Sequence, residues 1–374
     1  MSLPAGPFDV AVVGAGVVGL AHALACARRG LSVVVIDRDT RANGASIRNF
    51  GFVTVSGQEE GAMWRRARRS RDVWLDLAAA AGIPIHQRGM LLAARRPEAA
   101  AVLESFAAGP MAEGCELLGR EASARRFPGL AGGVAAALVS PHELRVEPRE
   151  AIPRIAAHLA AAHGVTFVWG AAVTSVEPGE VGTSRGSLAA RQTVVAPGDD
   201  ATALFPDLLA PFGLTRCKLQ MMRVRPSRPA LPHVLMSDLS LLRYGGFAAL
   251  PASGALRARL ERDAGPELAA GIHLIVAAAR DGTCVIGDSH VYDPTPDPFA
   301  DSAIDRMILD SYEALLGERP AVTESWTGTY ASAPATPVVV VAPAPEIRVV
   351  TVATGAGMSC SFALAEEIVE AMGS

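Results

Sequence analysis

The first forty residues of the chain alternate apolar runs with glycine-rich breaks. Residues 8–13 are a short apolar run followed by glycines, residues 17–29 have the length and spacing of a helix, and residues 31–36 are rich in β-branched side chains. A strand, a glycine turn, a helix and a second strand within about 30 residues predict a βαβ unit of a parallel sheet. The glycines that interrupt the apolar stretch 10–27 argue against a membrane-spanning helix.

Further elements follow from the same periodicities. The sequence predicts helices over residues 65–81, 117–127, 148–163 and about 361–372. It predicts strands over residues 89–94, 165–168, 172–177, 193–196, 220–225, 241–250, 273–278, 283–286 and 348–352, those between 220 and 286 in an antiparallel sheet. The pattern indicates an α/β chain with a Rossmann-like domain and a second domain on a mixed, mostly antiparallel sheet.

Length, charge and cysteine content narrow the class of protein. The chain has 374 residues, enough for two domains, and its net charge of −4 gives no reason to expect nucleic acid or an anionic membrane as a partner. The arginines of segment 65–71 are interpreted as a solvated helix face. Five cysteines are scattered without CxxC or metal-ligand spacing, so we expect no metal site and a reducing, cytoplasmic location.

The glycine turn has the pattern G-x-G-x-x-G. Gly14 permits a tight turn, Gly16 lets the backbone approach a pyrophosphate, and Gly19 lets the helix pack closely on the strand. The first turn of the helix then offers free amides and partial positive charge to the phosphates. Asp37 ends the next strand and is the expected acceptor for a ribose hydroxyl. It favours FAD or NAD over NADP, although the neighbouring Arg38 weakens that distinction.

The C-terminal segment favours FAD over NAD. There is one dinucleotide motif, whereas an FAD enzyme reduced by NAD(P)H through a dedicated domain normally has two. Residues 348–352 form a predicted strand that runs through Gly355 and Gly357 into the last helix. In a flavin enzyme, a helix N-terminus at this position can stabilise negative charge on the reduced ring.

Several further segments, in this order and spacing, resemble one family of flavoenzymes. The chain is similar along most of its length to D-amino-acid oxidase, glycine oxidase and sarcosine oxidase, the DAO family. The segments that carry the resemblance are residues 44–49, 146–149, 164–165, 173–177, 194–198 and 281–288. Asp199 and Asp200 depart from the small and aromatic residues usual after the glycine of segment 194–198.

The resemblance implies a glutathione-reductase-type FAD-binding domain formed by residues 1–85, 145–200 and 321–374, and a substrate domain formed by residues 86–144 and 201–320. It implies FAD bound without a covalent link, because residues 327–331 lack the cysteine that some sarcosine oxidases use. The residues that it assigns to the cofactor are Gly14, Gly16, Val17, Val18, Gly19, Asp37, Arg38, Ala45, Ser46, Arg48, Asn49, Val173, Ala196, Gly198, Gly355, Gly357, Met358 and Ser359.

Residues 46–54 and 241–247 look like the branch of this family associated with bacterial phosphonate breakdown. By that resemblance the substrate is 2-aminoethylphosphonate or its N-methyl form, oxidised by hydride transfer to flavin N5 to give phosphonoacetaldehyde. The expected acceptor is O2, which would yield H2O2. Val285 stands where sarcosine oxidases place a lysine that speeds oxygen reduction, so the acceptor stays open.

The substrate site is expected to bind an anion. Tyr330 aligns with the arginine that grips the substrate carboxylate in amino-acid oxidases, which argues against an ordinary α-amino acid. The candidate substrate-binding residues are Arg48, Arg243, Tyr244, Lys218, Tyr330 and Ser359. His142 and His290 are possible proton acceptors, but a lone histidine more often makes a structural polar contact. No catalytic triad or carboxylate pair is expected, because the flavin carries the oxidation.

Three alternatives stay open at this point. One is an oxidase of glycine, sarcosine, a D-amino acid or another small amine. The second is a flavin dehydrogenase that passes electrons to a carrier protein or a quinone. The third is a non-catalytic nucleotide-binding or tRNA-modifying flavoprotein, which the low basic charge disfavours.

Overall fold

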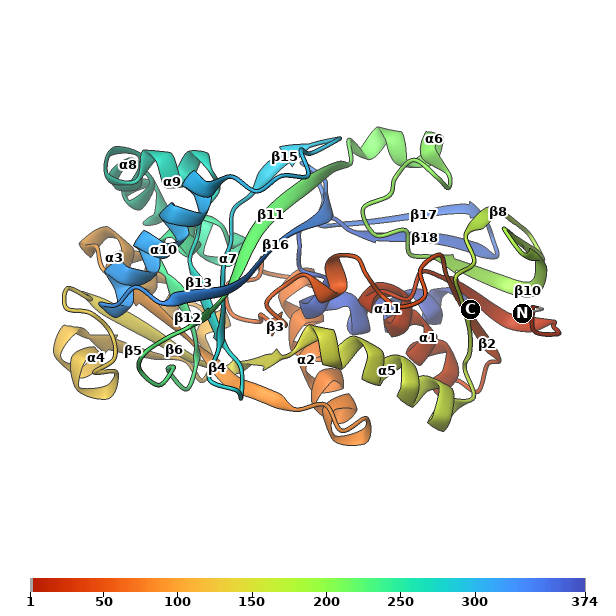
Figure 1. Ribbon diagram of the computed structural model, residues 1–374, viewed down its shortest axis with the longest axis horizontal. Helices are drawn as coiled ribbons and strands as arrows, with labels where there is room; N and C mark the ends of the chain where they lie inside the picture. Colours follow the sequence, from red (N-terminus) through yellow and green to blue (C-terminus); the bar gives the residue numbers. More distant parts are fainter. Residues whose placement is uncertain (1–2, 374) are drawn as a thin grey trace.

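The computed structural model describes residues 3–373, which form two lobes, each built around one β-sheet (Figure 1). One lobe contains an eight-stranded sheet and lies at the end of the molecule where the N and C labels stand. The other contains a ten-stranded sheet. The predicted fold class, a Rossmann-like nucleotide domain joined to a second domain on a mixed sheet, is confirmed.

The eight-stranded sheet has a parallel centre. Its main path runs β17-β18-β10-β1-β2-β7, with β1 pairing in parallel with both β10 and β2, and β9 and β8 extending it from β10. Its strands are β1 (Phe8–Val13), β2 (Val33–Asp37), β7 (Thr166–Trp169), β8 (Val173–Glu177), β9 (Glu180–Thr183), β10 (Gly186–Val195), β17 (Val338–Ala344) and β18 (Ile347–Val352).

Both faces of this sheet are covered, which explains why its strands are continuous apolar runs rather than alternating ones. Val10 and Val12 of β1 face one core, and Ala11 faces the other, because successive side chains of a strand point to opposite faces. The first core is filled by helices α1 (Val17–Arg28), α2 (Ala62–Ala80), α5 (Pro148–His163) and α11 (Gly357–Met372). The second core is closed by the β8–β9 hairpin and the segment holding α6 (Pro206–Leu209) and η3 (Ala210–Phe212).

The ten-stranded sheet is mostly antiparallel. Its path runs β15-β11-β14-β13-β12-β4-β6-β3, with β16 paired to β11 and β5 paired to β6; only β12 and β4 run parallel among the pairs recorded. Its strands are β3 (Phe52–Val53), β4 (Ile85–Ala94), β5 (Glu116–Gly119), β6 (Ala136–Val146), β11 (Thr215–Arg225), β12 (Val234–Ser237), β13 (Ile275–Ala278), β14 (Cys284–Gly287), β15 (Val291–Asp293) and β16 (Ala321–Ser332).

Helices cover this sheet on both sides as well. Leu92 of β4 packs into the core formed with helices α3 (Pro97–Ala107), α7 (Gly245–Ala248) and α8 (Ser253–Asp263), whereas Leu91 packs into the core formed with helix α10 (Ser302–Leu316). The remaining helical elements are η1 (Ala45–Ile47), η2 (Pro110–Ala112), α4 (Arg120–Arg126), η4 (Asp238–Leu242) and α9 (Gly265–Ala269).

Helix α5 shows how local signals set an element. Glu147 caps its N-terminus by accepting a hydrogen bond from the amide of Arg149, Pro148 occupies the first helical position, and Gly164 ends it in a left-handed conformation with φ of 66°. The predicted helix 148–163 is confirmed residue for residue. The strand–glycine turn–helix–strand unit at the start of the chain is confirmed with differences of one or two residues at the end of α1 and at both ends of β2.

Three sequence-based predictions need correction. Segment 241–250 is not a strand: it contains the end of η4 and helix α7, where Gly246 packs against the backbone of Gly57 and leaves no room for a strand partner. The predicted helix 117–127 is divided between strand β5 and helix α4, because Gly119 separates them. Residues 321–332, predicted in the FAD-binding part, form β16 and pair with β11 of the ten-stranded sheet.

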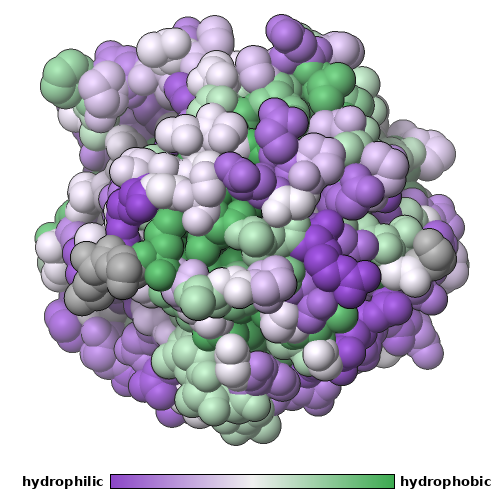
Figure 2. Space-filling model, turned by 90° about the vertical axis from the view of Figure 1, so that its right-hand side faces the viewer, coloured by the Kyte–Doolittle hydropathy of each residue, from purple (hydrophilic) through white to green (hydrophobic). Residues whose placement is uncertain are grey.

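Figure 2 shows the end of the molecule formed by the lobe with the eight-stranded sheet: polar side chains are spread over this face, and apolar side chains gather in a hollow near its middle. Among residues 3–373, no helix is both long and apolar enough to cross a lipid bilayer.

Candidate active site

A cavity of about 380 Å³ collects most of the predicted site residues. Its walls come from both lobes: the starts of α1 and α11 and the segment before β3 on one side, and strands β11, β13 and β16 with the η4–α7 segment on the other. The predicted residues that line it are Val17, Val18, Ala45, Ser46, Arg48, Asn49, Gly198, Arg243, Tyr244, His290, Tyr330, Gly355, Gly357, Met358 and Ser359.

The glycine turn next to this cavity is a backbone cradle in which side chains have no room. A Cβ atom on Gly14, whose φ is +100°, would lie 2.4 Å from the carbonyl oxygen of Ala196, and one on Gly19 would lie 1.8 Å from the carbonyl oxygen of Gly14. Gly16 caps α1 without a side-chain hydrogen bond. The first-turn amides of α1 therefore stay available to an anion, except that of Val17, which donates to Ser46 Oγ at 2.9 Å.

The acidic residue at the end of β2 is tied to this cradle. Asp37 is half-buried and accepts hydrogen bonds from the amide of Ala15 at 2.7 Å and from that of Asp39 at 2.9 Å. Each carboxylate oxygen keeps a lone pair for a further donor. Arg38 points elsewhere and pairs with Asp200 at 3.1 Å on the surface. The assignment of Asp37 to a ribose hydroxyl stays a prediction.

A second helix N-terminus faces the same cavity. Helix α11 begins at Gly357 after Ala356, has no side-chain cap, and has no acidic residue in its first turn. Its residues Met358 and Ser359 line the cavity, and Ser359 Oγ accepts a hydrogen bond from the buried amide of Thr54 at 2.9 Å. Two uncapped helix N-termini and a glycine cradle suit an anionic dinucleotide with a flat ring, which is the shape and charge of FAD.

The opposite wall presents cationic and phenolic groups. Arg243 turns its guanidinium toward the cavity and donates a hydrogen bond to Tyr330 Oη at 2.8 Å. Burial raises the pKa of the Tyr330 hydroxyl well above its usual value despite the opposing charge of Arg243, so the hydroxyl stays protonated and can donate. Tyr244 also lines the cavity, and burial raises its pKa.

Arg48 is the second arginine on the cavity wall. Its guanidinium has no hydrogen-bond or ion-pair partner among residues 3–373, and the backbone carbonyl of the same residue accepts a bond from Trp326 Nε1 at 3.4 Å. A Cβ on Gly328 would lie 3.2 Å from Arg48 Cβ. Gly328 and Tyr330 are two apart on β16 and so point to the same side of the sheet. Arg48, Tyr330 and Arg243 therefore occupy one stretch of wall.

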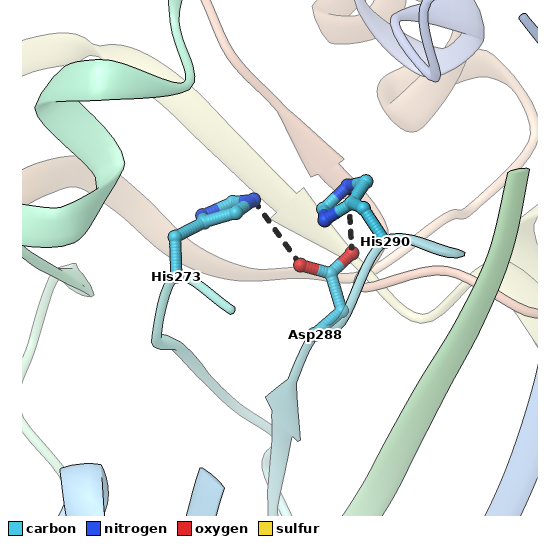
Figure 3. Close-up of side chains that lie close together, drawn as sticks. All are labelled: His273, Asp288 and His290. Carbon is cyan, nitrogen blue, oxygen red and sulfur yellow. Dashed lines mark ion pairs between the residues drawn. The ribbon is translucent and has the colours of Figure 1, made fainter. Parts of the chain in front are cut away.

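The structure brings together an unpredicted cluster on this wall, formed by His273, Asp288 and His290 (Figure 3). All three are at most 8% exposed. The Asp288 carboxyl lies between the two rings, 3.2 Å from His273 Nε2 and 3.8 Å from His290 Nε2. Burial raises the pKa of Asp288 to about 7 against the opposing charge of Arg243, and it lowers the pKa of His290 to about 3 and that of His273 well below its usual value.

Sequence reasoning named His290 but missed His273 and Asp288. A usable signal existed, because residues 273–278 and 283–286 were predicted as neighbouring strands. The β13–β14 hairpin pairs Ala278 with Cys284 and Ile275 with Gly287, so it brings the segments that hold His273 and Asp288 together. Continuing that register would set His273 opposite Ser289, so the two side chains meet through the chain beyond the paired residues, where the amide of His273 donates to the carbonyl of Asp288 at 3.3 Å.

Other predicted residues lie off the cavity lining. Lys218 is buried and donates hydrogen bonds to the carbonyls of Asp297 and Phe299 at 2.8 and 2.9 Å, so it holds a loop. His142 Nε2 lies 2.6 Å from the carbonyl oxygen of Glu113. Val173 lies in β8. The glycine cradle and its surroundings, rather than the cavity lining, contain Gly14, Gly16, Gly19, Asp37 and Ala196. Arg38 lies on the surface in its pair with Asp200.

Comparison with known proteins adds the following. The model of the family described as "DAO: FAD dependent oxidoreductase" matches residues 9–371. No curated protein sequence matches the chain significantly.

Among solved structures, glycine oxidase from Bacillus cereus superposes with a TM-score of 0.79 at 18% identity, covering 98% of this chain and 95% of that one. L-proline dehydrogenase from P. horikoshii gives a TM-score of 0.78 at 18% identity, covering 98% and 93% of the two chains. L-α-glycerophosphate oxidase from Mycoplasma pneumoniae, solved with FAD bound, also gives 0.78 at 18% identity, covering 98% and 95%. At these identities the likeness establishes the fold.

Proposed function

The chain belongs to the DAO family of FAD-dependent oxidoreductases, and from this premise we propose that it oxidises a small amine that carries an anionic group. The leading substrates are 2-aminoethylphosphonate and N-methyl-2-aminoethylphosphonate, with phosphonoacetaldehyde and ammonia or methylamine as products. The observation that carries the proposal is the cationic wall made by Arg48 and Arg243 in the cavity beside the nucleotide cradle.

An arginine without a protein acceptor is costly to keep half-buried unless a ligand pairs with it. Arg48 is half-buried, lines the cavity and has no acceptor among residues 3–373. Within residues 3–373, the side chain of Arg243 donates one hydrogen bond, to the neutral hydroxyl of Tyr330. In the part of the chain that the structure describes, neither positive charge has a carboxylate at hydrogen-bonding distance, which supports an anionic substrate group between them.

The arrangement of the donors favours a tetrahedral anion. A planar carboxylate is best held by the two parallel N–H groups of one arginine, whereas a phosphonate presents three oxygens in different directions. Arg48, Arg243 and the protonated hydroxyl of Tyr330 come from three separate elements, so they can approach a ligand from different sides. This is the geometry that supports a phosphonate over an α-carboxylate.

Bound FAD supplies the two-electron acceptor for the C–N bond. The residues suited to hold it are the glycine cradle of α1 for the pyrophosphate and the start of α11, with Ser359, for the ring. The chain's own task is then to bind the anionic end of the substrate, to point its amine-bearing carbon at the ring, and to shield the site from bulk water. Val285 is buried in β14 at the position where sarcosine oxidases place a lysine that speeds oxygen reduction. Experiment must therefore decide between O2 and another electron acceptor.

The proposal is tested by mixing the flavoprotein anaerobically with matched amines and following the loss of flavin absorbance. 2-Aminoethylphosphonate and its N-methyl form are compared with 3-aminopropanoate and 2-aminoethanesulfonate, which keep the spacing but change the anion, and with glycine and sarcosine. We expect the phosphonates to give a specificity constant about 10-fold or more above the others.

Faster bleaching with glycine or sarcosine would replace the proposal by the amino-acid oxidase alternative. Bleaching with a phosphonate but no H2O2 in air would identify a dehydrogenase. No bleaching with any of the six amines would exclude amine oxidation of this class.

A further inference from the structure

We propose that Asp288, supported by His290 and His273, is the group that takes the proton from the substrate's ammonium before the C–N bond is oxidised. The inference rests on the proposed amine oxidation and adds a catalytic base that the oxidation by itself does not specify. An amine is protonated in water near neutral pH, yet only the neutral amine has the nitrogen lone pair that drives loss of hydride from the neighbouring carbon.

Asp288 lies where it can reach a bound substrate. Asp288, His273 and His290 all line the cavity that also contains Arg48, Arg243 and Tyr330. A substrate whose anion is held by the arginines therefore has its amine within the same enclosed space as the carboxyl. Among residues 3–373, His273–Asp288–His290 is the cluster in which a carboxylate and two imidazoles offer atoms within 4.8 Å of one another.

His290 is oriented so that it can help Asp288 hold a proton. Its Nδ1 lies 2.8 Å from the carbonyl oxygen of Gly271, and a carbonyl only accepts, so Nδ1 carries the hydrogen. In the neutral ring the Nε2 lone pair then faces Asp288 Oδ2 at 3.8 Å. Two lone pairs that face each other in a dry site favour a proton between them. His290 is thus a partner that helps Asp288 hold an accepted proton.

Asp288 also has unmet hydrogen-bonding capacity. Its Oδ1 is buried and has no hydrogen-bond donor, although His273 Nε2 lies 3.2 Å away. His273 Nδ1 is in turn 3.2 Å from the hydroxyl of Ser240, which fixes the ring. A buried carboxylate that lacks donors is stabilised when an ammonium or a proton reaches it.

The charged and titratable groups around the cluster come from several elements. Arg243 and Tyr244 stand at the η4–α7 segment, Tyr292 on β15, Tyr330 on β16 and Cys217 on β11. The charge of Arg243 acts on Asp288 against the effect of burial, and it repels a second positive charge in the same cavity. The same repulsion lowers the pKa of a bound ammonium toward that of the carboxyl, which is the condition for efficient proton transfer.

The step is balanced. One N–H bond of the ammonium breaks, its electron pair stays on nitrogen, and an O–H bond forms on Asp288. The total charge of the site does not change. Since the carboxyl titrates at about pH 7 and accepts a proton only when ionised, the rate of substrate oxidation should rise with pH through neutrality.

The experiment follows the rate of anaerobic flavin bleaching with 2-aminoethylphosphonate from pH 6 to pH 10 in the FAD-loaded protein. Asp288→Asn should slow bleaching about 10²-fold or more at pH 8. The deficit should shrink toward pH 10, where the solution itself supplies neutral amine. Asp288→Glu should recover part of the rate, and His290→Gln should lower it less than Asp288→Asn. His142→Gln, a histidine outside the cavity, is the matched control and should leave the profile unchanged.

A second measurement does not depend on turnover. Infrared difference spectra of the FAD-loaded protein between pH 5 and pH 9 should show a protonated carboxyl band that titrates near neutrality and is missing in Asp288→Asn. This band reports the protonation of the Asp288 carboxyl even if no amine is oxidised, so failure of the proposed function and failure of this inference are distinguishable.

Three results would overturn the inference. One is a wild-type pH profile and rate retained in Asp288→Asn. Another is a loss that is equal at every pH, which would make Asp288 a positioning residue of the fold. The third is a stoichiometric divalent cation in the purified protein whose removal by chelation abolishes bleaching, which would make the cluster a metal site.

Discussion

The two walls of the cavity achieve binding by different means. The wall from the eight-stranded sheet offers backbone: a glycine turn and the uncapped starts of α1 and α11. The wall from the ten-stranded sheet offers side chains: Arg243, Tyr330 and the Asp288 cluster. A backbone site suits a cofactor that is the same throughout a family, whereas a side-chain site can differ from one substrate to the next without disturbing the fold.

The largest effect is expected at the backbone wall. Gly19→Ala places a Cβ 1.8 Å from the carbonyl oxygen of Gly14, and a backbone atom cannot move aside as a flexible side chain can. We expect purified protein without bound flavin, measured as the ratio of flavin to protein absorbance. Gly254→Ala is the control, because it is also helical and has open space around its Cβ. Full flavin content in Gly19→Ala would contradict a close cradle.

The next largest effect is expected for a group of buried ion pairs between the two walls, at the point where β6 leads into α5. Arg145 is fully buried and pairs with Glu147 at 2.9 Å, and Arg223 pairs with the same carboxylate at 3.2 Å. Glu147→Gln leaves buried positive charge unpaired and should lower the free energy of unfolding by about 3–5 kcal/mol. Glu150→Gln, an exposed acid in the same helix, should change it by less than about 1 kcal/mol. Denaturant titration measures both.

The same carboxylate predicts a pH dependence. Burial pushes the pKa of Glu147 up, but Arg145 and Arg223 outweigh burial and hold it below its usual value of about 4.5. A lowered pKa in the folded state stabilises the fold above that value, and this stabilisation is lost as the pH falls through the folded pKa. Glu147→Gln should therefore flatten the acid side of the stability profile. An unchanged acid limb would assign acid unfolding to other groups.

A smaller effect tests the side-chain wall. Arg48→Ala should weaken substrate binding by about 10- to 150-fold, the equivalent of one charged hydrogen bond of about 1.5–3 kcal/mol, and should change FAD binding less. Arg41→Ala, which removes an exposed arginine off the cavity lining, is the control. Substrate and FAD titrations separate the two effects. Equal loss of both affinities would make Arg48 structural.

The smallest effect is expected for Arg38→Ala. Its side chain is 63% exposed and its pair with Asp200 lies on the surface. Such a pair contributes about 0.2–1 kcal/mol and less in high salt. Thermal unfolding and FAD titration should hardly change. A large loss of FAD affinity would show that Arg38, rather than the cradle, carries nucleotide binding.

The contrast between the walls also explains how much could be predicted. Gly14, Gly16, Gly19 and Asp37 lie close in sequence, and their spacing alone predicts strand, turn and helix, because local backbone geometry dictates it. Arg48, Arg243 and Tyr330 were named through a family resemblance, but only the fold brings them to one wall. The residues proposed to take up the substrate's proton are likewise brought together only by the fold. His273 and Asp288 lie just beyond the paired residues of the β13–β14 hairpin, and no spacing rule encodes their contact or their burial.

Two predictions that the structure does not match, for residues 241–250 and for Lys218, have a related cause. Residues 241–250 have strand-like composition, yet Gly246 packs on Gly57 and the chain turns into a helix there. Lys218 has the charge wanted at an anion site, but its ammonium is used by two loop carbonyls. In both cases a tertiary contact overrides a local preference, which sequence alone does not reveal.

Strand β16 offers a practical route to altered specificity. It carries Gly328 under Arg48 and Tyr330 beside Arg243, and it reaches the turn before α11 through the bridge between Ser332 and Thr354. Its inward positions recur at every second residue. A small library confined to alternate residues of this one strand would reshape the pocket for other amines while leaving the glycine cradle, and hence cofactor loading, untouched.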